Sequence, residues 1–497
     1  MKRFTYLLFI PLCLSLFACT SKDDKQLITI TNSIADQLSK NNCEAAYNRM
    51  SEDYKLSISL ARFEEEWKAF TSGAACTSFK SRAVKTDTSA YKSFQTKFQF
   101  DKKTLYANFI FGKGALYPTG LKLSENKNLI SSKNKKDGQT LRELSEAYFK
   151  IGSGIYGYNK KTCAINYPEY MDTLKTHFSS CTMTNLMKPS SILNQKKSKE
   201  NIKNGIEEPY LDFSAIEDTL QWCLDNNVKM RGHTLVWHTQ APVWFFKENY
   251  DDKGNYVSRE VMINRMDSMI KQYMEYCQTK FPGVVYCWDV VNEAVDPTNG
   301  DKNSPFRCRI MNDKERNNWY FTIGADYPRL AFISARKYAA PGVTLFYNDY
   351  GTTDKSKREC IYKLCKSLKE EGLIDGIGMQ AYWDNRNPSL KTIADTINYY
   401  AELGLEIQLT EWSMNADAYN ERGLETQAER YASIFRLLQK LDTQGGGKAN
   451  ITCVSTFGVM DGYPLYSNDK TSSRFFDKDL KPKPVFHSVK ETLQLFY

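Results

Sequence analysis

The strongest constraint on the fold is a rhythm of apolar segments that begins near residue 141. Eight short runs of apolar, β-branched and aromatic residues follow one another, and most are separated by stretches with helical periodicity. Strands that alternate with helices over about 350 residues are typical of a (β/α)8 barrel. A doubly wound open sheet is the alternative, which is disfavoured because no glycine-rich phosphate loop follows the first run. The runs are YFKIGSGI, FSSCTMTN, VKMRGHTLVWH, VVYCWDVVNEA, VTLFYNDYG, IDGIGMQAYW, LEIQLTEW and ITCVSTFGVMD.

The segments between these runs carry the helical pattern. In residues 258–281, apolar side chains recur at steps of three or four residues, which predicts a helix with one buried face. Residues 354–371 repeat the pattern, and Gly372 follows them as a helix C-terminal signal. We therefore predict an α/β protein, a (β/α)8 TIM barrel preceded by a small α+β domain.

The length of the chain indicates two domains. A chain of 497 residues exceeds what one hydrophobic core usually supports, about 250–300 residues. Residues 19–125 contain helical stretches and then alternating segments such as KFQFDKKTLYANFIF, which indicates the small α+β domain. Residues 126–140 are polar and rich in lysine and asparagine, so we expect a linker there. The barrel domain would then span residues 141–497.

The α+β segment carries the pattern AYNRMSEDYK…FEEEW. This pattern resembles the cone-shaped, ketosteroid-isomerase-like domains of lipoproteins. No catalytic constellation is evident in the segment, so we expect a spacer or a binding module of unknown ligand.

The first residues have the pattern of a bacterial export signal. Lys2 and Arg3 precede an apolar stretch, residues 4–17, that is too short for an ordinary membrane-spanning helix. The letters LFAC that end at Cys19 resemble a lipoprotein lipobox. The resemblance implies that residues 1–18 are a signal peptide and that Cys19 is lipidated. The protein would then be extracytoplasmic and membrane-anchored, at the cell surface or in the periplasm; ordinary cleavage or an uncleaved anchor are the alternatives.

Charge and cysteine usage exclude several classes of function. The net charge of +9 is spread over many lysine-rich stretches rather than one basic stripe, so no nucleic-acid partner is expected. Only four histidines occur and no cysteine pair has zinc spacing, so no metal and no other cofactor is expected. Cys43 and Cys76 are a possible disulfide pair in an exported protein. Cys181, Cys287 and Cys453 lie in strand-like segments and are expected to be small core residues.

Polar side chains gather at the ends of the expected barrel strands, where the active site of such a barrel lies. Two glutamates stand out: Glu293 near the end of the fourth run and Glu411 near the end of the seventh, on opposing sides of the barrel mouth. Paired carboxylates perform glycoside hydrolysis, one as proton donor and one as ionised nucleophile. His233 and Tyr382 are the expected hydrogen-bond donors to Glu411, and a structural ion pair is the alternative role for the glutamates. The remaining polar strand-end residues are Asn185, Lys188, Trp237, His238, Gln240, Asn292, Asn348, Asp349 and Gln380.

Several of these motifs together resemble glycoside hydrolase family 10, the retaining endo-1,4-β-xylanases. RGHTLVWHTQAP, WDVVNEA, LFYNDY, IDGIGMQ and LTEW occur in the family's order, FFDKDLKPKPVF fits its C-terminal ending, and the match covers roughly residues 145–490. The resemblance implies that Glu293 is the general acid/base and Glu411 the nucleophile of a double displacement through a glycosyl-enzyme. It also implies a polysaccharide or oligosaccharide substrate of the xylan type. The substrate-binding residues would be Asn185, Lys188, His233, Trp237, Gln240, Asn292, Gln380, Tyr382 and Phe457.

The sequence departs from the family pattern at expected substrate contacts. Thr184 stands where the family usually has a glutamate, and Tyr382 stands where it has a histidine that bonds the nucleophile. A phenol can also donate a hydrogen bond to a carboxylate, so we expect Tyr382 to keep that role. Two family tryptophans that offer flat faces to sugar rings are replaced by Phe457 and Leu465.

Trp383 and Trp412 are expected to pack behind the strands rather than to replace those tryptophans. The glutamate pair favours an active retaining O-glycosyl hydrolase that acts on xylan or a related β-1,4-glycan. The altered sugar contacts leave two alternatives: a non-catalytic glycan-binding surface lipoprotein, and an enzyme for a different glycoside.

Overall fold

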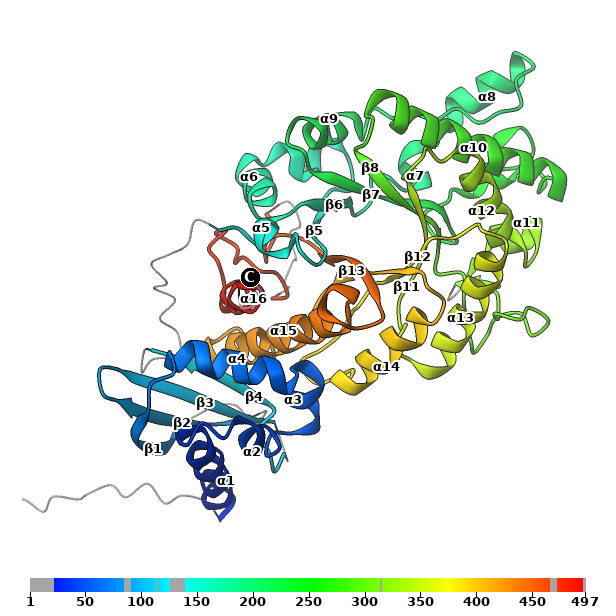
Figure 1. Cartoon of the computed structure of the whole chain (residues 1–497). Coiled ribbons are helices and arrows are strands. Elements are labelled where there is room, and N and C mark those ends of the chain that lie inside the picture. Colours follow the sequence, from blue (N-terminus) through cyan, green and yellow to red (C-terminus); the bar gives the residue numbers. More distant parts are fainter. Residues whose placement is uncertain are drawn as a thin grey trace, which may run out of the picture. The chain divides into compact units, whose positions relative to one another are not determined.

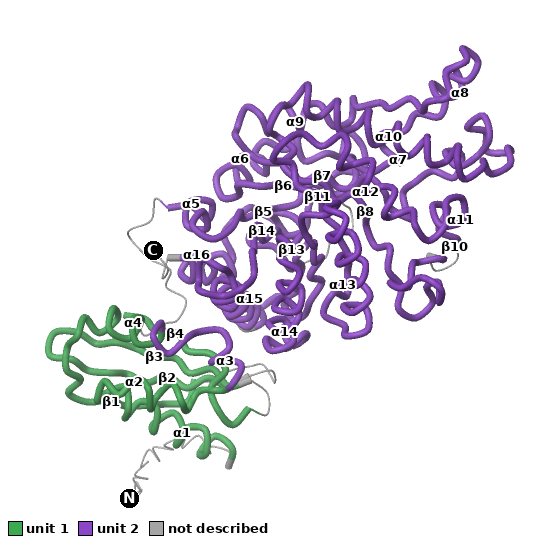
Figure 2. The backbone as a smooth tube through the Cα atoms, turned by 45° about the vertical axis from the view of Figure 1, so that its right-hand side comes forward, with its two compact units in different colours: residues 1–51, 63–127 green, residues 52–62, 128–497 purple. Residues whose placement is uncertain are grey.

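Residues 22–84, 91–112, 115–125, 139–312, 315–464 and 472–494 are described by the computed structural model of the chain. The chain divides into two compact units, residues 1–51 with 63–127 and residues 52–62 with 128–497 (Figure 2). Cys19 and the rest of the expected export signal, Leu465, and all but the last two residues of the expected linker 126–140 lie outside the described residues.

An antiparallel sheet forms the centre of the N-terminal unit. Its strands follow the order β1-β2-β3-β4, and each pairs with its sequence neighbour in the antiparallel direction. Phe94 lies opposite Phe109, and Phe98 opposite Leu105, so these buried side chains share one apolar face. Helices followed by an antiparallel sheet confirm the predicted small α+β domain. The elements of residues 22–125, of which residues 52–62 are grouped with the second unit, are α1 (Lys22–Ser39), α2 (Cys43–Tyr47), α3 (Glu52–Ser57), α4 (Leu60–Thr71), β1 (Cys76–Val84), β2 (Tyr91–Phe100), β3 (Thr104–Gly112) and β4 (Gly120–Ser124).

The possible disulfide between Cys43 and Cys76 is wrong, because both cysteines are free. Cys43 is buried at the start of α2, whereas the thiol of Cys76 donates to the carbonyl of Ser78 within β1 at 3.3 Å. The two thiols therefore have separate environments.

Eight parallel strands close the barrel of the second unit, which confirms the predicted TIM barrel and rules out the open sheet (Figure 1). The last strand pairs with the first, so that Cys453 lies opposite Lys150 and Thr456 opposite Ser153. Most strands are buried along their length because helices cover the outside of the barrel. In chain order the strands are β5 (Lys150–Ile155), β6 (Ser180–Met183), β7 (Lys229–Trp237), β8 (Val285–Asn292), β11 (Thr344–Asp349), β12 (Gly376–Met379), β13 (Glu406–Trp412) and β14 (Asn450–Thr456).

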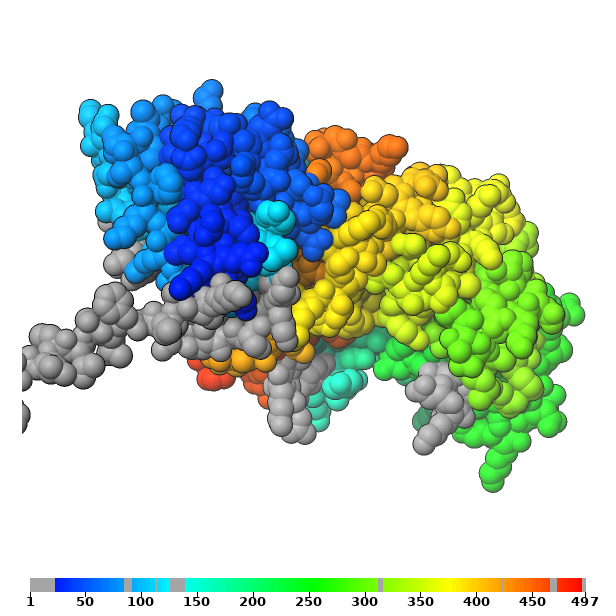
Figure 3. Space-filling view, turned by 90° about the horizontal axis from the view of Figure 1, so that it is seen from below, coloured from blue at the N-terminus to red at the C-terminus, as the bar shows by residue number. Residues whose placement is uncertain are grey.

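The surrounding helices follow the periodicity of the sequence. In α10, the predicted apolar stripe is buried: Met262, Met266, Met269, Tyr273 and Cys277. The space-filling view shows that side chains close the gaps between the helices of residues 355–401, in yellow (Figure 3). The helices are α5 (Leu141–Ser145), α6 (Pro168–His177), α7 (Pro189–Ile192), α8 (Gln195–Lys203), α9 (Glu217–Asp225), α10 (Arg259–Lys280), α11 (Asn318–Ile323), α12 (Tyr327–Tyr338), α13 (Lys355–Glu370), α14 (Leu390–Ala401), α15 (Glu421–Leu441) and α16 (Pro484–Gln494).

Shorter elements lie in the connections of the barrel. A two-stranded ribbon of β9 (Met311–Asn312) and β10 (Glu315–Arg316) follows β8. The 3₁₀ turns are η1 (Lys160–Thr162), η2 (Ala164–Asn166), η3 (Val243–Phe246), η4 (Glu248–Tyr250) and η5 (Thr443–Gly445).

Cys181, Cys287 and Cys453 are free and fully buried, as expected for small core residues. Within the described part of the chain, no helix has both the length and the apolar character needed to cross a membrane. The same residues contain no group of three or more histidine, cysteine, aspartate or glutamate side chains placed to hold a metal ion.

Candidate active site

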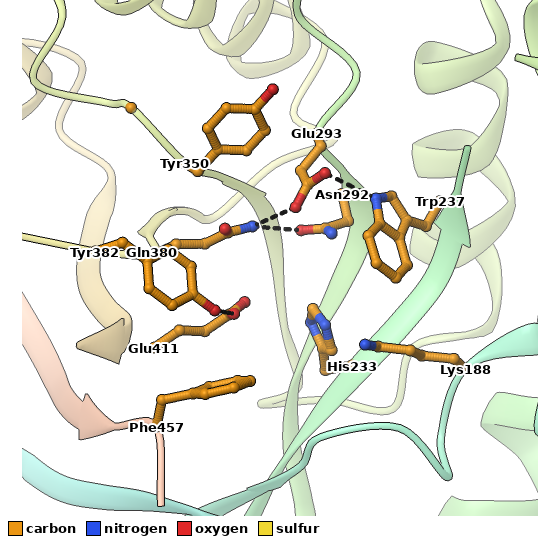
Figure 4. A pocket seen from close by; sticks show the side chains of 11 residues that line it. Lys188, His233, Trp237, Asn292, Glu293, Tyr350, Gln380, Tyr382, Glu411 and Phe457 are labelled. Atoms are coloured by element: carbon orange, nitrogen blue, oxygen red, sulfur yellow. Dashed lines mark hydrogen bonds between the residues drawn. The ribbon is translucent and has the colours of Figure 1, made fainter. Parts of the chain in front are cut away.

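A cavity of about 480 Å³ opens at the carboxyl ends of the barrel strands (Figure 4). This volume is in the range of small-molecule and oligosaccharide sites, roughly 300–1,000 Å³. Glu293 and Glu411 project into it from different strands, as the sequence predicted. The complete lining is Lys188, His233, Trp237, Asn292, Glu293, Tyr350, Gly351, Gln380, Tyr382, Glu411 and Phe457.

Glu293 follows the last residue of β8 and is held through both its backbone and its side chain. Its φ of +57° lies in the left-handed region, which costs an ordinary residue on the order of 1–2 kcal/mol. Its N–H donates to the carbonyl of Asn348 at 2.9 Å, and its own carbonyl accepts from Arg309 Nε at 2.8 Å. The carboxylate accepts from Trp237 Nε1 at 3.0 Å and from Gln380 Nε2 at 2.8 Å. Two backbone and two side-chain hydrogen bonds therefore fix Glu293 at the cavity.

Glu411 lies on β13 and is almost buried, with two hydrogen-bond donors. Oε1 accepts from Asn348 Nδ2 at 3.1 Å, and Oε2 accepts from the Tyr382 hydroxyl at 2.5 Å. Desolvation of the hydroxyl end and the negative charge of Glu411 hold the pKa of Tyr382 well above its usual value, so the hydroxyl keeps its proton. Tyr382 thus occupies the donor position predicted for it.

His233 is not a donor to Glu411, so this part of the prediction is wrong. Its Nδ1 lies 2.8 Å from Oδ2 of Asp289, a carboxylate buried inside the barrel. Burial alone would raise the pKa of Asp289, but Arg231 binds both carboxylate oxygens, at 3.0 and 2.6 Å, and the net pKa is lowered. An ionised Asp289 accepts the Nδ1 proton of His233, which leaves Nε2 as the ring nitrogen free for a ligand.

Asn348 links the residues of the site from the end of β11. Its Nδ2 donates to Asn292 at 2.9 Å as well as to Glu411, and its Oδ1 accepts from Thr410 at 2.7 Å. Because its backbone carbonyl also holds Glu293, one residue contacts both glutamates. The sequence placed Asn348 at a strand end but indicated no role for it.

Lys188 and Trp237 form a charged and aromatic wall. The ammonium of Lys188 lies 4.6 Å from the centroid of the Trp237 ring and is almost buried. Burial lowers the pKa of Lys188, although the negative charges of Glu411 and Glu293 oppose this effect. The geometry favours a ligand with hydroxyl groups that can accept a hydrogen bond from this ammonium.

Two predicted binding residues, Asn185 and Gln240, do not line the cavity. They lie on the connections after β6 and β7, where Gln240 Nε2 donates to Asn185 Oδ1 at 3.4 Å. The other seven predicted binding residues all belong to the lining. Thr184 is nearly buried next to them, and its hydroxyl donates to the carbonyl of Ile155 at 3.3 Å.

Aromatic contact at the other end of the cavity comes from Phe457 and Tyr382. Their rings meet edge to face, with centroids 5.9 Å apart. Trp412 is fully buried and lies 4.3 Å from the ring of Tyr431, and Trp383 packs against it. Trp383 and Trp412 therefore pack behind the strands, as predicted.

Sequence reasoning missed Tyr350 and Gly351, which follow β11 and complete the lining. The Tyr350 hydroxyl accepts from Arg309 Nη2 at 3.0 Å, and the ammonium of Lys357 lies 3.2 Å from its ring centroid. The signal was present in the sequence, since an aromatic residue directly after a polar strand end is placed at the barrel mouth.

Asp349 forms a buried ion pair behind Tyr350. Its Oδ1 lies 2.7 Å from Lys357 Nζ, and Oδ2 accepts from the Tyr347 hydroxyl at 2.5 Å. Burial raises the pKa of this carboxyl to about 6; the charge of Lys357 opposes the rise, and that of Glu293 adds to it.

Two carboxylates on different strands of a (β/α)8 barrel, each held by its own donors over an open cavity, are the machinery of a glycoside hydrolase. Comparison with known proteins agrees with this class. The sequence profile of glycosyl hydrolase family 10 matches residues 140–492. The chain therefore belongs to glycosyl hydrolase family 10, and it is an O-glycosyl hydrolase of the endo-1,4-β-xylanase type.

Individual relatives share the barrel domain. A candidate endo-1,4-β-xylanase of Caldicellulosiruptor saccharolyticus is 43% identical over 311 residues, which are 61% of this chain and 95% of that protein. Endo-1,4-β-xylanase B of Butyrivibrio fibrisolvens is 37% identical over 353 residues, which are 70% of this chain but only 52% of that protein.

Solved structures show the same likeness. The family 10 and carbohydrate-binding modules of a Clostridium thermocellum xylanase, in complex with xylohexaose, superpose with a TM-score of 0.64 at 25% identity and cover 85% of this chain and 84% of that one. A Thermoanaerobacterium saccharolyticum xylanase in complex with xylotriose has a TM-score of 0.58 at 29% identity and covers 71% of this chain and 99% of that one.

Proposed function

We propose that the protein is a retaining endo-hydrolase that cleaves xylan or a related β-1,4-linked glycan by double displacement. The observation that carries the proposal is the placement of two glutamates, each with its own hydrogen-bond donors, around one cavity at the barrel mouth. Glu411 accepts from Tyr382 and Asn348, and Glu293 accepts from Trp237 and Gln380. The xylo-oligosaccharides bound by relatives support the choice of substrate.

In the first chemical step, a carboxylate oxygen of Glu411 attacks the anomeric carbon. The bond from that carbon to the glycosidic oxygen breaks, and Glu293 gives its proton to the departing oxygen. The product of this step is a glycosyl ester on Glu411, in which the configuration at the anomeric carbon is inverted. A second inversion in the next step restores the original configuration. Tyr382 and Asn348 orient the attacking carboxylate, and the proposal implies that the two carboxyl groups lie about 5–5.5 Å apart.

In the second step, the ionised Glu293 takes a proton from water, and the hydroxide oxygen attacks the anomeric carbon. Glu411 leaves as a carboxylate, stabilised again by the Tyr382 hydroxyl, and Glu293 has regained its proton. Asn292, His233, Lys188 and Phe457 line the cavity; in the proposed complex the first three bond sugar hydroxyls and Phe457 offers an apolar face.

A hydrolysis assay tests this proposal. Wild type and Glu411→Gln are incubated with xylan, mixed-linkage glucan and mannan, and reducing ends are counted. We expect xylan hydrolysis by the wild type, loss of about four orders of magnitude in the variant, and β-configured product in proton NMR spectra. If both proteins released only the same background of reducing ends from every substrate, the proposed hydrolase activity would be refuted.

The alternative is a non-catalytic glycan-binding protein, and one observation favours it. At the end of the cavity opposite Lys188 and Trp237, the aromatic side chains available to a sugar are Phe457 and Tyr382, whereas the family pattern has tryptophans there. Calorimetric titration with xylohexaose distinguishes the two. Binding that releases no xylose oligomers over a day would support the alternative, whereas turnover would exclude it.

We also propose that the protein is exported and anchored by a lipid on Cys19, on the support of the lipobox-like letters LFAC. Cells that express wild type or Cys19→Ser are fed an alkyne fatty acid, and labelled protein is detected after extraction. Label in the wild type alone is expected. Equal labelling of both proteins, or of neither, would contradict the anchor.

A further inference from the structure

We infer that Arg309 is a positioning residue that holds the proton donor Glu293 and the cavity wall Tyr350 in fixed relation. The inference rests on the proposed function, because it assigns Arg309 an effect on the protonation step. Arg309 does not line the cavity and touches no substrate in this scheme. It acts through the backbone carbonyl of Glu293 and the hydroxyl of Tyr350.

The guanidinium of Arg309 joins the tips of β8 and β11. Nε donates to the carbonyl of Glu293 at 2.8 Å, and Nη2 donates both to the carbonyl of Val295 at 3.0 Å and to the hydroxyl of Tyr350 at 3.0 Å. Asp296 lies near the remaining nitrogen, with 3.7 Å between Nη1 and Oδ2. A planar fork with fixed donor directions is needed to reach all of these acceptors at once.

Arg309 is itself held rigidly, so it can serve as a reference point. Its N–H donates to the carbonyl of Ala294 at 2.7 Å, and its carbonyl accepts from Asn317 Nδ2 at 2.9 Å. Beside it, Cys308 pairs with Val295 in an antiparallel bridge. The side chain of Arg309 is only 8% exposed, so water does not compete freely for its donors.

Glu293 needs this support because its backbone is left-handed, with φ of +57°. A residue in that region persists only when its surroundings specify it. The Arg309 bond fixes the direction of the Glu293 carbonyl, and hence the line along which its side chain leaves toward Trp237 and Gln380. Tyr350 stands beside Glu293 in the cavity (Figure 4), so the same arginine sets the wall next to the proton donor.

The test compares Arg309→Lys and Arg309→Met with a matched control, Arg265→Lys. Arg265 is equally buried, and its Nη1 donates to the carbonyls of Phe245 and Lys247, both at 2.8 Å, but it contacts neither Glu293 nor the cavity. Each variant is assayed on xylohexaose, whose leaving group needs a proton, and on 2,4-dinitrophenyl xylobioside, whose leaving group does not. Thermal unfolding curves report the folding of each variant.

We expect kcat/KM on xylohexaose to fall about 10- to 100-fold for both Arg309 variants, since small misplacement of a catalytic group has effects of this size. The loss on the dinitrophenyl substrate should stay within about threefold, and Lys should rescue part of the Met effect. Arg265→Lys should lower both activities alike, if at all. In a Glu293→Ala background, Arg309→Lys should change neither activity further.

Equal losses on the two substrates, or an undiminished Arg309 effect in the Glu293→Ala background, would overturn the inference. Crystal structures of wild type and Arg309→Lys give a readout that needs no activity: the Glu293 carboxylate should leave Trp237 or Gln380 in the variant. An unmoved Glu293 would overturn the inference even if the wild type proved inactive, which would refute the proposed function separately.

Discussion

The hydroxyl of Tyr382 offers the sharpest test of how the nucleophile is prepared. Tyr382→Phe removes the donor that lies 2.5 Å from Glu411 Oε2. It keeps the ring that meets Phe457 edge to face. The substitution therefore isolates one hydrogen bond, and Asn348 still donates to the other carboxylate oxygen at 3.1 Å.

The size of the effect follows from these contacts. A hydrogen bond to a charged group contributes about 1.5–3 kcal/mol, which corresponds to about 10- to 150-fold in rate. Because Asn348 still donates to Glu411, we expect the lower part of this range, about 10- to 30-fold. The second chemical step should suffer most, since Glu411 departs there as a carboxylate that has lost a donor.

The assay uses 2,4-dinitrophenyl xylobioside, for which glycosylation is fast. We expect kcat to fall about tenfold and a burst of phenolate equal to the enzyme concentration to appear. Tyr400→Phe is the matched control, because the buried Tyr400 hydroxyl donates to the carbonyl of Thr352, at 3.3 Å, and Tyr400 does not line the cavity. A kcat within twofold of wild type, with no burst, would refute the assigned role of the hydroxyl.

Three further outcomes follow from the same site. Glu293→Ala should abolish xylan hydrolysis but largely spare the dinitrophenyl substrate, and equal losses on both would contradict its role as acid. Asn348→Ala should lower kcat/KM on both substrates by about 100-fold or more, because Asn348 contacts both glutamates; a loss confined to xylan would count against this. Asp349→Asn tests the raised pKa of about 6. In the unfolded chain this carboxyl has a pKa near 3.8, so ionising it in the folded protein costs about 3 kcal/mol more than in the unfolded chain. The wild type is therefore most stable below pH 4, and it loses this stability as the pH rises to 6. The unfolding free energy of Asp349→Asn relative to wild type should therefore rise between pH 4 and 6.5 in urea titrations, and a constant difference would show that Asp349 is not responsible.

The positions of the catalytic candidates were predictable because a parallel barrel collects the ends of its strands. Glu293 and Glu411 lie near the ends of two apolar runs and are 118 residues apart, and the topology alone brings both to one mouth. Gln380 and Tyr382 follow β12 and reach the same cavity for the same reason. Strand periodicity was sufficient for this level of the structure.

The partners of those residues were not predictable, because they depend on lateral register and on buried charge. The Nδ1 atom of His233 bonds Asp289, because burying a carboxylate inside the barrel is costly unless it accepts hydrogen bonds. Asn185 and Gln240 bond each other on loops whose geometry no periodicity describes. Arg309 lies 16 residues after Glu293 in an irregular segment, so no sequence signal connected the two.

The pairing of β14 with β5 has a consequence for how the protein is made. Lys150 and Cys453 lie opposite each other although some 300 residues of chain separate them. A ribosome must therefore deliver nearly the whole domain before the ring of strands can close, and contacts of such long sequence range form slowly. Until then, the open edges of β5 and β13 can pair with a neighbouring nascent chain. The interval just before β14 emerges is thus when this barrel is most prone to aggregate.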